Sequence, residues 1–237
     1  MRLVITMMPR QDGKMQDVYK HAIQGFIYKM LERTAYSGLH DAWGFKFFCF
    51  SDIFPISPFQ EGKYKKLIIS SPDEKFIRIL GEACLTTPRA HLGPVPIEIT
   101  GVKPVELRVT RSFITGSPVV MYKNNRKNLY FSFNKGDSVP YFLERALDNA
   151  VTKYNAYHGG NLEPNFPLFD RLTFKKEVAI KNVISGREFL MIGSTWTRLE
   201  KVMIEPELFP FYTFLLDAGL GEKNSMGFGF LNPCQPA

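Results

Sequence analysis

The order of strand-like and helix-like segments constrains the fold of this chain more than any other feature of its sequence. In the first half, segments whose apolar residues alternate with a period of two are separated by segments whose apolar residues recur at helical spacing. We predict a strand at Arg2–Met8, a helix at Asp17–Arg33, strands at Phe45–Phe50 and Tyr64–Ser70, a helix from Ser71 to about Leu85, and an edge strand or linker at Pro94–Val102. The order is therefore strand, helix, strand, strand, helix, strand.

Local signals support the two helices in this half. The first helix has an apolar stripe of residues at helical spacing, namely Tyr19, Ile23, Phe26, Ile27 and Met30. The second helix carries a start signal, with Ser71 as N-cap, Pro72 at the first helical position and Glu74 completing a capping box. These signals place each helix between strands, as the element order requires.

The second half repeats this order once a hairpin is set aside as an insertion. Its predicted elements are a strand at Val105–Ile114, the inserted hairpin at Val119–Phe133 with its turn at Asn124–Asn125, a helix from Ser138 to about Tyr154, a hairpin at Glu177–Gly193 turning at Ser185–Gly186, a helix at Pro206–Asp217 and a final strand. Strand, helix, strand, strand, helix, strand is the ferredoxin-like pattern. The predicted fold class is therefore α+β, with two tandem ferredoxin-like (RRM-like) domains at residues 1–100 and 104–237.

Composition and charge narrow the class of protein. The chain has 237 residues, of which 45% are hydrophobic, enough for a sizeable core in one large domain or two small ones. Its formal net charge of +7 favours an anionic partner, nucleic acid before membrane. No apolar run approaches the ~20 residues of a membrane span, and no signal peptide is visible. Because the three cysteines, Cys49, Cys84 and Cys234, are widely spaced, we expect no disulfide framework or zinc knuckle and a reducing, cytoplasmic location.

A glycine-rich segment, GLGEKNSMGFGF, occupies Gly219–Phe230. A dinucleotide-binding fingerprint would follow a strand and open a helix, and a Walker A loop would continue with Gly-Lys-Ser/Thr. Here the predicted order is helix, loop, strand, so the segment disfavours a nucleotide cofactor. Gly219 directly follows the predicted helix and suits a left-handed C-cap.

The remainder of this segment suits a backbone that another molecule can approach closely. Its interior offers Lys223, Asn224 and Ser225 as donors for phosphate oxygens. Leu220 and Phe228 are expected to anchor its two flanks in the core. A purely structural loop is the alternative interpretation.

Two apolar-spaced glycine pairs, five residues apart and close to the C-terminus, resemble the signature of the RAMP superfamily. The four matching glycines are Gly219, Gly221, Gly227 and Gly229. More closely, the chain resembles the CRISPR-associated endoribonucleases that cut repeat RNA in precursor CRISPR transcripts. The likeness extends to GFIYKMLE...LHDAWGFKFFCFS within Gly25–Ser51, and the element order covers essentially the whole chain. The resemblance implies RNA contacts along the glycine-rich segment, with no cofactor and no metal.

Metal-free cleavage of RNA through its 2′-hydroxyl needs a base, an acid and a cation beside the reacting phosphate. The four histidines, His21, His40, His91 and His158, show no metal-ligand spacing. His40 stands out because Asp41 is beside it and Lys46 lies six residues on. A solvated surface histidine is the alternative interpretation for each of the four.

The resemblance assigns candidate catalytic roles. Members of the family often carry a histidine in a loop after the first helix and a lysine at the start of the next strand, matched here by His40 and Lys46. A tyrosine of the first helix, matched by Tyr28, completes the site. A helical wheel places Tyr28 roughly 140° from the centre of the apolar stripe, which leaves a catalytic residue and a surface aromatic equally open. The expected roles are general acid for His40, contact with the 2′-hydroxyl for Tyr28 (with His21 as its substitute), and charge stabilisation for Lys46.

Basic residues interleaved with aromatics indicate further RNA contacts. The inserted hairpin carries Lys123, Arg126 and Lys127 around its tip, where they can reach a phosphate backbone. The basic stretch RLTFKKEVAIK at Arg171–Lys181 is a weaker candidate. Hairpin tips and strand faces are also charged for solubility alone, so both interpretations stay open.

Two functions follow from these features. The first is a metal-independent endoribonuclease that matures CRISPR RNA, leaving 2′,3′-cyclic phosphate and 5′-hydroxyl ends. The second is a non-cleaving RNA-binding subunit of the same superfamily within a CRISPR ribonucleoprotein. His40 with Lys46 favours the first, because a pure binder needs no loop histidine. The expected partner is CRISPR repeat RNA; a homodimer and contacts with other CRISPR effector-complex proteins stay open, and no membrane partner is expected.

Overall fold

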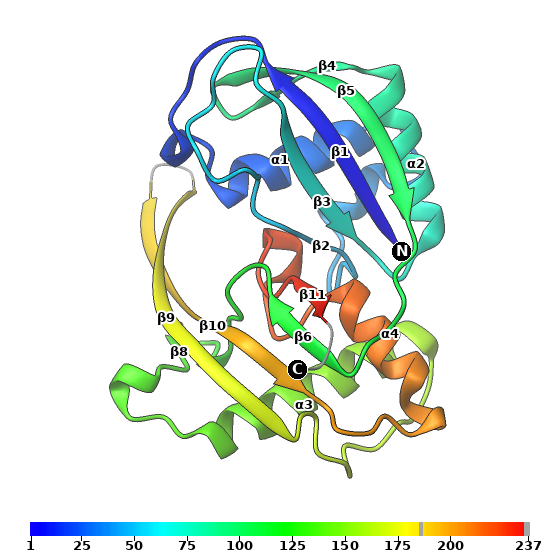
Figure 1. Cartoon of the computed structure of the whole chain (residues 1–237), viewed down its shortest axis with the longest axis vertical. Coiled ribbons are helices and arrows are strands. Elements are labelled where there is room, and N and C mark those ends of the chain that lie inside the picture. The colour runs from blue at the N-terminus through cyan, green and yellow to red at the C-terminus, as the bar shows by residue number, and fades with distance from the viewer. Residues whose placement is uncertain (185–186, 235–237) are drawn as a thin grey trace.

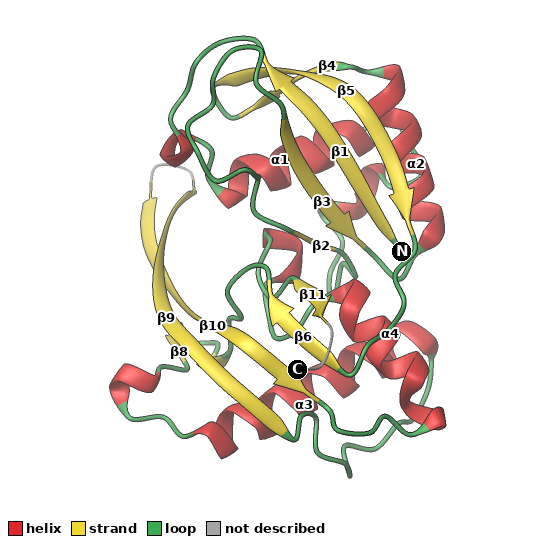
Figure 2. Cartoon of the chain, viewed as in Figure 1, coloured by secondary structure: helices red, strands yellow, loops and turns green. Residues whose placement is uncertain are grey.

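The structure is a computed structural model that describes residues 1–184 and 187–234. Figure 1 and Figure 2 show two antiparallel sheets, one from each half of the chain, with helices packed against both. The fold is therefore α+β, as the element order predicted. Within the described residues, no helix combines the length and the apolarity needed to cross a membrane.

The first sheet has the strand order β2-β3-β1-β5-β4. Its strands are β1 (Arg2–Pro9), β2 (Cys49–Phe50), β3 (Lys65–Ser70), β4 (Arg89–Leu92) and β5 (Val95–Val105). Helices α1 (Lys20–Leu31) and α2 (Glu74–Thr86) lie together behind it in Figure 1. Short 3-10 helices at Met15–Asp17 and Ser37–Leu39 flank α1. The apolar faces of both helices join the strands in one buried core.

The second sheet has the strand order β11-β6-β10-β9. Its strands are β6 (Ser112–Thr115), β9 (Arg171–Ile184), β10 (Arg187–Glu200) and β11 (Leu231–Cys234). The helices of this half are α3 (Val139–His158) and α4 (Phe209–Ala218), with 3-10 helices at Phe133–Lys135, Pro206–Leu208 and Asn224–Met226. The predicted inserted hairpin is present as β7 (Tyr122–Asn124) and β8 (Leu129–Tyr130). Its turn was predicted wrongly at Asn124–Asn125, because Asn124 still belongs to β7, the turn spans residues 125–128 and the positive φ is at Asn128. The predicted hairpin of β9 and β10 is also present, but its turn at Ser185–Gly186 lies outside the described residues.

The two sheets share one strand order. In each half the four main strands are arranged fourth, first, third and second in order of their appearance along the chain, and β4 is an addition beside β5. This addition corrects the prediction for Pro94–Val102, because β5 is an interior strand and β4 forms the edge. The predicted strand at Val105–Ile114 is also wrong for most of its length, since β5 ends where it was to begin and β6 starts only at Ser112.

The aromatic segment Phe45–Phe50 differs from its prediction because of one backbone torsion. Phe47 has a positive φ of 45°, which an extended strand does not allow, so β2 is reduced to two residues. The Ser71 hydroxyl donates to the Phe47 carbonyl at 2.7 Å and accepts from the Asp73 amide at 3.1 Å, but Ser71 is not the N-cap and Pro72 is not the first helical residue, because α2 starts later. Asp73 takes that place, accepting a hydrogen bond from the Phe76 amide at 3.0 Å. Helix α2 consequently begins at Glu74.

Helix α1 keeps most of its predicted apolar stripe. Ile23, Phe26, Ile27 and Met30 are buried, whereas Tyr19 is the exposed N-cap residue. The stripe fails at Tyr19 because the helix starts after it.

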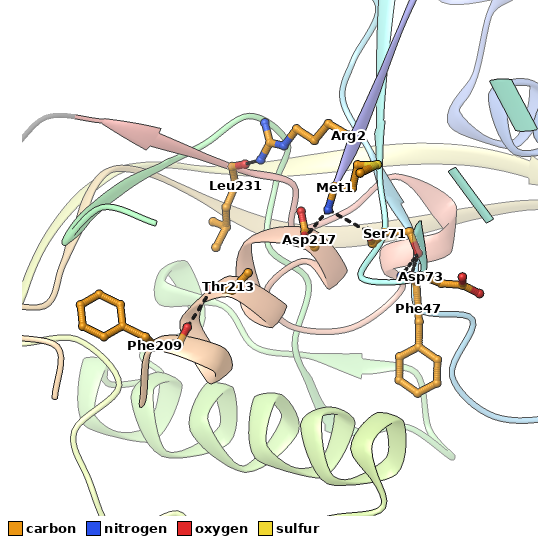
Figure 3. A network of polar contacts seen from close by, with 9 residues as sticks. All are labelled: Met1, Arg2, Phe47, Ser71, Asp73, Phe209, Thr213, Asp217 and Leu231. Carbon is orange, nitrogen blue, oxygen red and sulfur yellow. Dashed lines mark hydrogen bonds and ion pairs between the residues drawn. The ribbon is translucent and has the colours of Figure 1, made fainter. Parts of the chain in front are cut away.

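Polar contacts join the two halves, as Figure 3 shows. The amino group of Met1 contacts the Asp217 carboxylate at 2.5 Å and the Ser71 carbonyl at 3.0 Å. The Arg2 guanidinium donates to the carbonyl of Leu231 and lies 4.3 Å from the centre of the Phe230 ring. Met1 and the first residue of β1 therefore tie the first half to α4 and β11 of the second half.

Candidate functional site

Tyr28, His40 and Lys46 lie together at the C-terminal end of α1. The rings of Tyr28 and His40 meet edge to face with their centroids 5.0 Å apart. The Lys46 ammonium lies 5.4 Å from the centre of the Tyr28 ring. Tyr28 comes from α1, whereas His40 and Lys46 come from the connection between α1 and β2. Three residues spread over 28–46 are thus gathered into one polar group by the return of the chain after the helix.

The Lys46 side chain binds back to the backbone of the segment that carries His40. Its ammonium donates to the Leu39 carbonyl at 2.8 Å and also to the His40 carbonyl. Partial burial lowers the pKa of Lys46, and the nearby Asp41 carboxylate counteracts that shift. Lys46 therefore positions His40 through its backbone as well as supplying a positive charge.

His40 is open to solvent and oriented by its neighbour in sequence. Its Nδ1 lies 2.6 Å from the Asp41 Oδ1, and the His40 side chain is 65% exposed. An ionised carboxylate only accepts hydrogen bonds, so Nδ1–H donates to Asp41 and Nε2 is the atom left for proton exchange. The arrangement suits a proton donor or acceptor for a molecule arriving from solvent.

Tyr28 connects this group to the glycine-rich segment. Its hydroxyl lies 3.5 Å from the Gln24 Nε2, and the Ser225 side chain is also a hydrogen-bond partner. Burial raises the pKa of Tyr28 above its ordinary value, while these two hydrogen bonds pull it down less strongly. At neutral pH Tyr28 is therefore a phenol, able to donate and accept a hydrogen bond but not present as phenolate.

A cleft of about 620 Å³ runs beside this group and between the two halves. Its walls come from the segment around Lys46, from α3, from the β7–β8 hairpin and from the glycine-rich segment. The basic residues that line it are Lys46, Lys123, Arg145, Lys153 and Lys223. Among the described residues that line the cleft, Glu222 is the one acidic residue. A polyanion suits such a cleft, because most of the charge that it presents is positive.

The four glycines of the segment are buried by close packing. A Cβ atom would lie 1.8 Å from the Leu220 carbonyl oxygen at Gly229, 2.2 Å from the Phe50 ring at Gly227 and 2.6 Å from the Val120 carbonyl oxygen at Gly221. Each of these glycines also has a positive φ. The glycines are therefore required by the packing of the segment itself.

Gly219 ends α4 as predicted, but in a different conformation. Its amide donates to the Leu215 carbonyl at 3.0 Å, and its φ of 88° is combined with a ψ of 157°. This extended, positive-φ region is essentially restricted to glycine and is not the left-handed helical cap that was predicted. The flanking residues Leu220 and Phe228 are fully buried, as expected.

Lys153 is a residue of the cleft lining that the sequence interpretation missed. It lies on α3, is only 3% exposed, and donates to the carbonyls of Gly219 at 2.6 Å and Gly221 at 2.9 Å. It also donates to the Asn224 Oδ1 at 2.8 Å. Desolvation lowers the pKa of Lys153 to about 7. The sequence did carry a signal for the burial of Lys153. This lysine lies seven residues after the buried Ala146, and residues at that spacing share one face of a helix.

A second lysine holds the segment from the other side. The Lys20 ammonium donates to the Gly227 carbonyl at 2.8 Å and to the Asp52 carboxylate at 2.6 Å. Asn224 closes the segment from within, with its Nδ2 donating to the carbonyls of Leu220 and Phe228. The Asn224 Oδ1 accepts from Lys153, so both polar atoms of the Asn224 side chain are used within the protein. Only the backbone of Asn224 can contact a ligand.

The predicted RNA-contact residues differ in their accessibility. Lys223 is exposed at the rim of the cleft, with its ammonium 5.5 Å from the centre of the Tyr122 ring. Lys123 lines the cleft but is paired with Asp137 at 2.5 Å. Arg126 and Lys127 are exposed in the hairpin turn and do not line the cleft.

The remaining histidines lie elsewhere. His21 and His91 line a second groove, between α1 and β4, and His158 is the last residue of α3. His21 is seven residues before Tyr28, about 10 Å along the helix axis, and does not line the cleft. His21 is therefore too far along the helix to take the position of Tyr28 as its substitute.

The fold and the cleft define an α+β protein with one main antiparallel sheet in each half and a basic groove between the halves, beside a tyrosine, a histidine and a lysine. The family model for the C-terminal part of the CRISPR associated protein Cas6 matches residues 102–233. The CRISPR-associated endoribonuclease Cas6 2 of Methanocaldococcus jannaschii is 42% identical over 239 residues, covering 98% of this chain and 99% of that protein. The chain therefore belongs to the Cas6 family.

Solved structures share this fold over the whole chain. A structure described as CRISPR associated protein Cas6 superposes with a TM-score of 0.75 at 19% identity, covering 99% of each chain. A structure described as a RAMP protein binding different RNA substrates gives a TM-score of 0.71 at 19% identity, covering 99% of this chain and 100% of that one. At such identities the likeness shows the arrangement of the two sheets.

Proposed function

We propose that this chain is a metal-independent endoribonuclease that cleaves within CRISPR repeat RNA and so generates mature CRISPR RNAs. The observation that carries the proposal is the meeting of Tyr28, His40 and Lys46 beside a basic cleft. A relative that is 42% identical over nearly the full chain is named an endoribonuclease, which supports the same activity here. The three side chains supply a hydroxyl that can orient the 2′-oxygen, a proton carrier for the leaving oxygen and a cation for the phosphate charge, and solvent water can take the proton of the 2′-hydroxyl.

The proposed mechanism gives each side chain one task. Tyr28 contacts and orients the 2′-hydroxyl as a phenol, in keeping with its raised pKa. The 2′-oxygen attacks the adjacent phosphorus and gives up its proton to solvent water, the bond from phosphorus to the 5′-oxygen breaks, and His40 gives a proton to that departing oxygen through Nε2. Lys46 stabilises the negative charge that develops on the phosphorane oxygens. The products are a 2′,3′-cyclic phosphate and a 5′-hydroxyl end.

The RNA is proposed to lie along the cleft between the two halves. Lys223 and the backbone around Asn224 and Ser225 would contact its phosphates beside Tyr28, and Lys123 would do so if it leaves Asp137. Arg126 and Lys127 would extend the contact beyond the cleft. The buried glycines, Gly219, Gly221, Gly227 and Gly229, would act indirectly by giving the segment its shape.

We further infer that each half is a ferredoxin-like domain. The shared strand order, with the fourth strand beside the first and the third between the first and second, supports this assignment. The proposed boundary, residues 100–104, falls near the C-terminal end of β5, which pairs with β1 as far as Val105. The first domain would then carry the catalytic group and the second the glycine-rich segment.

The decisive experiment incubates the protein with its CRISPR repeat RNA in EDTA and compares it with a His40→Ala variant. We expect cleavage by the unsubstituted protein, with cyclic-phosphate and 5′-hydroxyl ends, and a loss of about 10²-fold or more in the variant. His91→Ala is the matched control, because His91 is an exposed histidine on β4 outside the cleft. Full cleavage by His40→Ala would remove His40 from the mechanism, and RNA binding without cleavage by the unsubstituted protein would favour a non-cleaving subunit.

A further inference from the structure

Trp43 is fully exposed in the segment that connects His40 to Lys46. Its side chain has 101% of its reference accessibility, so no other part of the described protein covers it. The neighbouring Phe45 is partly exposed and lines the cleft. Single exposed apolar residues are common on protein surfaces. Trp43 differs from most of them because it lies three residues from each of two candidate catalytic side chains.

The segment that carries Trp43 is held at both ends. At one end the Lys46 ammonium binds the carbonyls of Leu39 and His40. At the other, Phe45 packs on the Phe47 ring with centroids 5.8 Å apart. Gly44 turns the backbone with a φ of 89°, and a Cβ there would meet nothing within 4 Å. The turn therefore presents Trp43 outward from a fixed base.

We propose that Trp43 stacks on an unpaired nucleobase of the RNA next to the phosphate that is cleaved, and that the partly exposed Phe45 ring beside it extends the apolar surface. The proposal rests on the proposed function, because it takes the phosphate to lie at Tyr28, His40 and Lys46. A phosphate held by Lys46 leaves the base of an adjoining nucleotide within reach of a side chain three residues away.

The chemistry of the segment fits single-stranded RNA. Proteins that hold unpaired nucleic acid combine cations for the phosphates with aromatic rings on which bases stack. Here Lys46 supplies the cation, and Trp43 and Phe45 supply the rings. Stacking accepts any base, so this contact would fix the position of the strand without reading its sequence.

Tryptophan fluorescence tests the contact directly, because the chain has two tryptophans and Trp196 is only 2% exposed. The probe is the repeat RNA with a 2′-deoxy nucleotide at the cleavage position, which blocks the attack and separates binding from cutting. We expect the RNA to quench the emission of the unsubstituted protein, and Trp43→Ala to abolish the quench and weaken binding about tenfold. Trp43→Phe, which keeps an aromatic ring, should restore most of the affinity.

Two comparisons make the test specific. Ile56→Ala removes another exposed apolar side chain, 79% accessible and outside the cleft, and should leave binding unchanged. Replacing the nucleotide beside the cleavage site by an abasic one should weaken binding to the unsubstituted protein but add little to Trp43→Ala. Equal binding by Trp43→Ala and the unsubstituted protein, together with unchanged emission on adding RNA, would overturn the proposal.

The outcomes also separate this inference from the proposed endoribonuclease activity. If RNA quenches the emission of Trp43 but is never cleaved, the proposed stacking contact is supported and the proposed endoribonuclease activity is wrong. If the protein cleaves the RNA in a His40-dependent way while the emission of Trp43 stays constant, the proposed activity is supported and the proposed stacking contact is wrong. Absence of RNA binding by the unsubstituted protein would overturn both.

Discussion

The ammonium of Lys153 donates a hydrogen bond to the backbone carbonyl of Gly219 at 2.6 Å, although the two residues are 66 positions apart in sequence. The same ammonium reaches the Gly221 carbonyl and the Asn224 amide oxygen. A charged side chain that is 3% exposed is costly to bury unless every donor is used, and here all three protons have a partner. The glycine-rich segment is thus organised around a buried cation supplied by α3.

Replacing this cation should loosen the segment. In Lys153→Met the carbonyls of Gly219 and Gly221 lose a buried donor, which costs ~1–3 kcal/mol each, and burying an apolar side chain in place of a polar amine recovers part of that loss. We expect the free energy of unfolding in urea at pH 8 to fall by about 2 kcal/mol. Lys75→Met, at an exposed lysine of α2, should leave it unchanged. Equal stability of the Lys153→Met and unsubstituted proteins would show that the segment holds its shape without the ammonium.

The ionisation of Lys153 makes a second prediction, with a defined sign. Burial lowers its pKa to about 7 in the folded protein, whereas an unfolded chain keeps the proton to about pH 10. Between these values the unfolded state binds more protons, so the free energy of unfolding rises with pH, by at most ~1.4 kcal/mol per pH unit. Subtracting the unfolding free energy of Lys153→Met at each pH isolates this group. We expect the difference to grow in favour of the unsubstituted protein from pH 7 to 9, and a flat difference would contradict the depressed pKa.

The sequence predicted what depends on local pattern and missed what depends on distant contacts. The apolar period placed β1 and the α1 core residues correctly, because both signals are confined to neighbouring positions. The positive φ of Phe47 could not be predicted, since it follows from how the segment between α1 and β2 returns across the fold. Lys153 was missed because a lysine on a helix is usually solvated, and only its partners on the glycine-rich segment explain its burial.

The glycines offer a test of packing against flexibility. At Gly229 a Cβ would lie 1.8 Å from the Leu220 carbonyl oxygen, and φ is +70°. Gly229→Ala should therefore lower the free energy of unfolding by on the order of 4 kcal/mol, or prevent folding. Gly25→Ala is the matched control, because a Cβ on that helical glycine meets nothing within 4 Å and should raise stability by about 1 kcal/mol. Thermal and urea unfolding of the two variants measure the contrast, and a tolerated Gly229→Ala would show that the segment can rearrange.

Substitution of Tyr28 by phenylalanine removes the hydroxyl and keeps the aromatic ring. In Tyr28→Phe the edge-to-face contact with His40 is kept, and the hydrogen bonds to Gln24 and Ser225 are lost. Because the raised pKa keeps this residue a phenol, its proposed task is to orient the 2′-hydroxyl, and its loss should slow cleavage about tenfold to a hundredfold with little change in RNA affinity. Single-turnover rates and equilibrium binding separate the two effects. A variant that cuts at the unsubstituted rate would assign Tyr28 to packing alone.

Lys223 makes the final prediction, on the salt dependence of binding. Its ammonium is exposed at the rim of the cleft, so a contact with an RNA phosphate would release one counterion. For a single-stranded RNA, Lys223→Ala should reduce the slope of log affinity against log salt by about 0.7, and it should weaken binding to all sequences alike. Lys75→Ala, at a lysine of α2 outside the cleft, should leave the slope unchanged. If Lys223→Ala and Lys75→Ala give the same slope as the unsubstituted protein, the RNA does not pass over the glycine-rich segment, and the path proposed for it along the cleft is wrong.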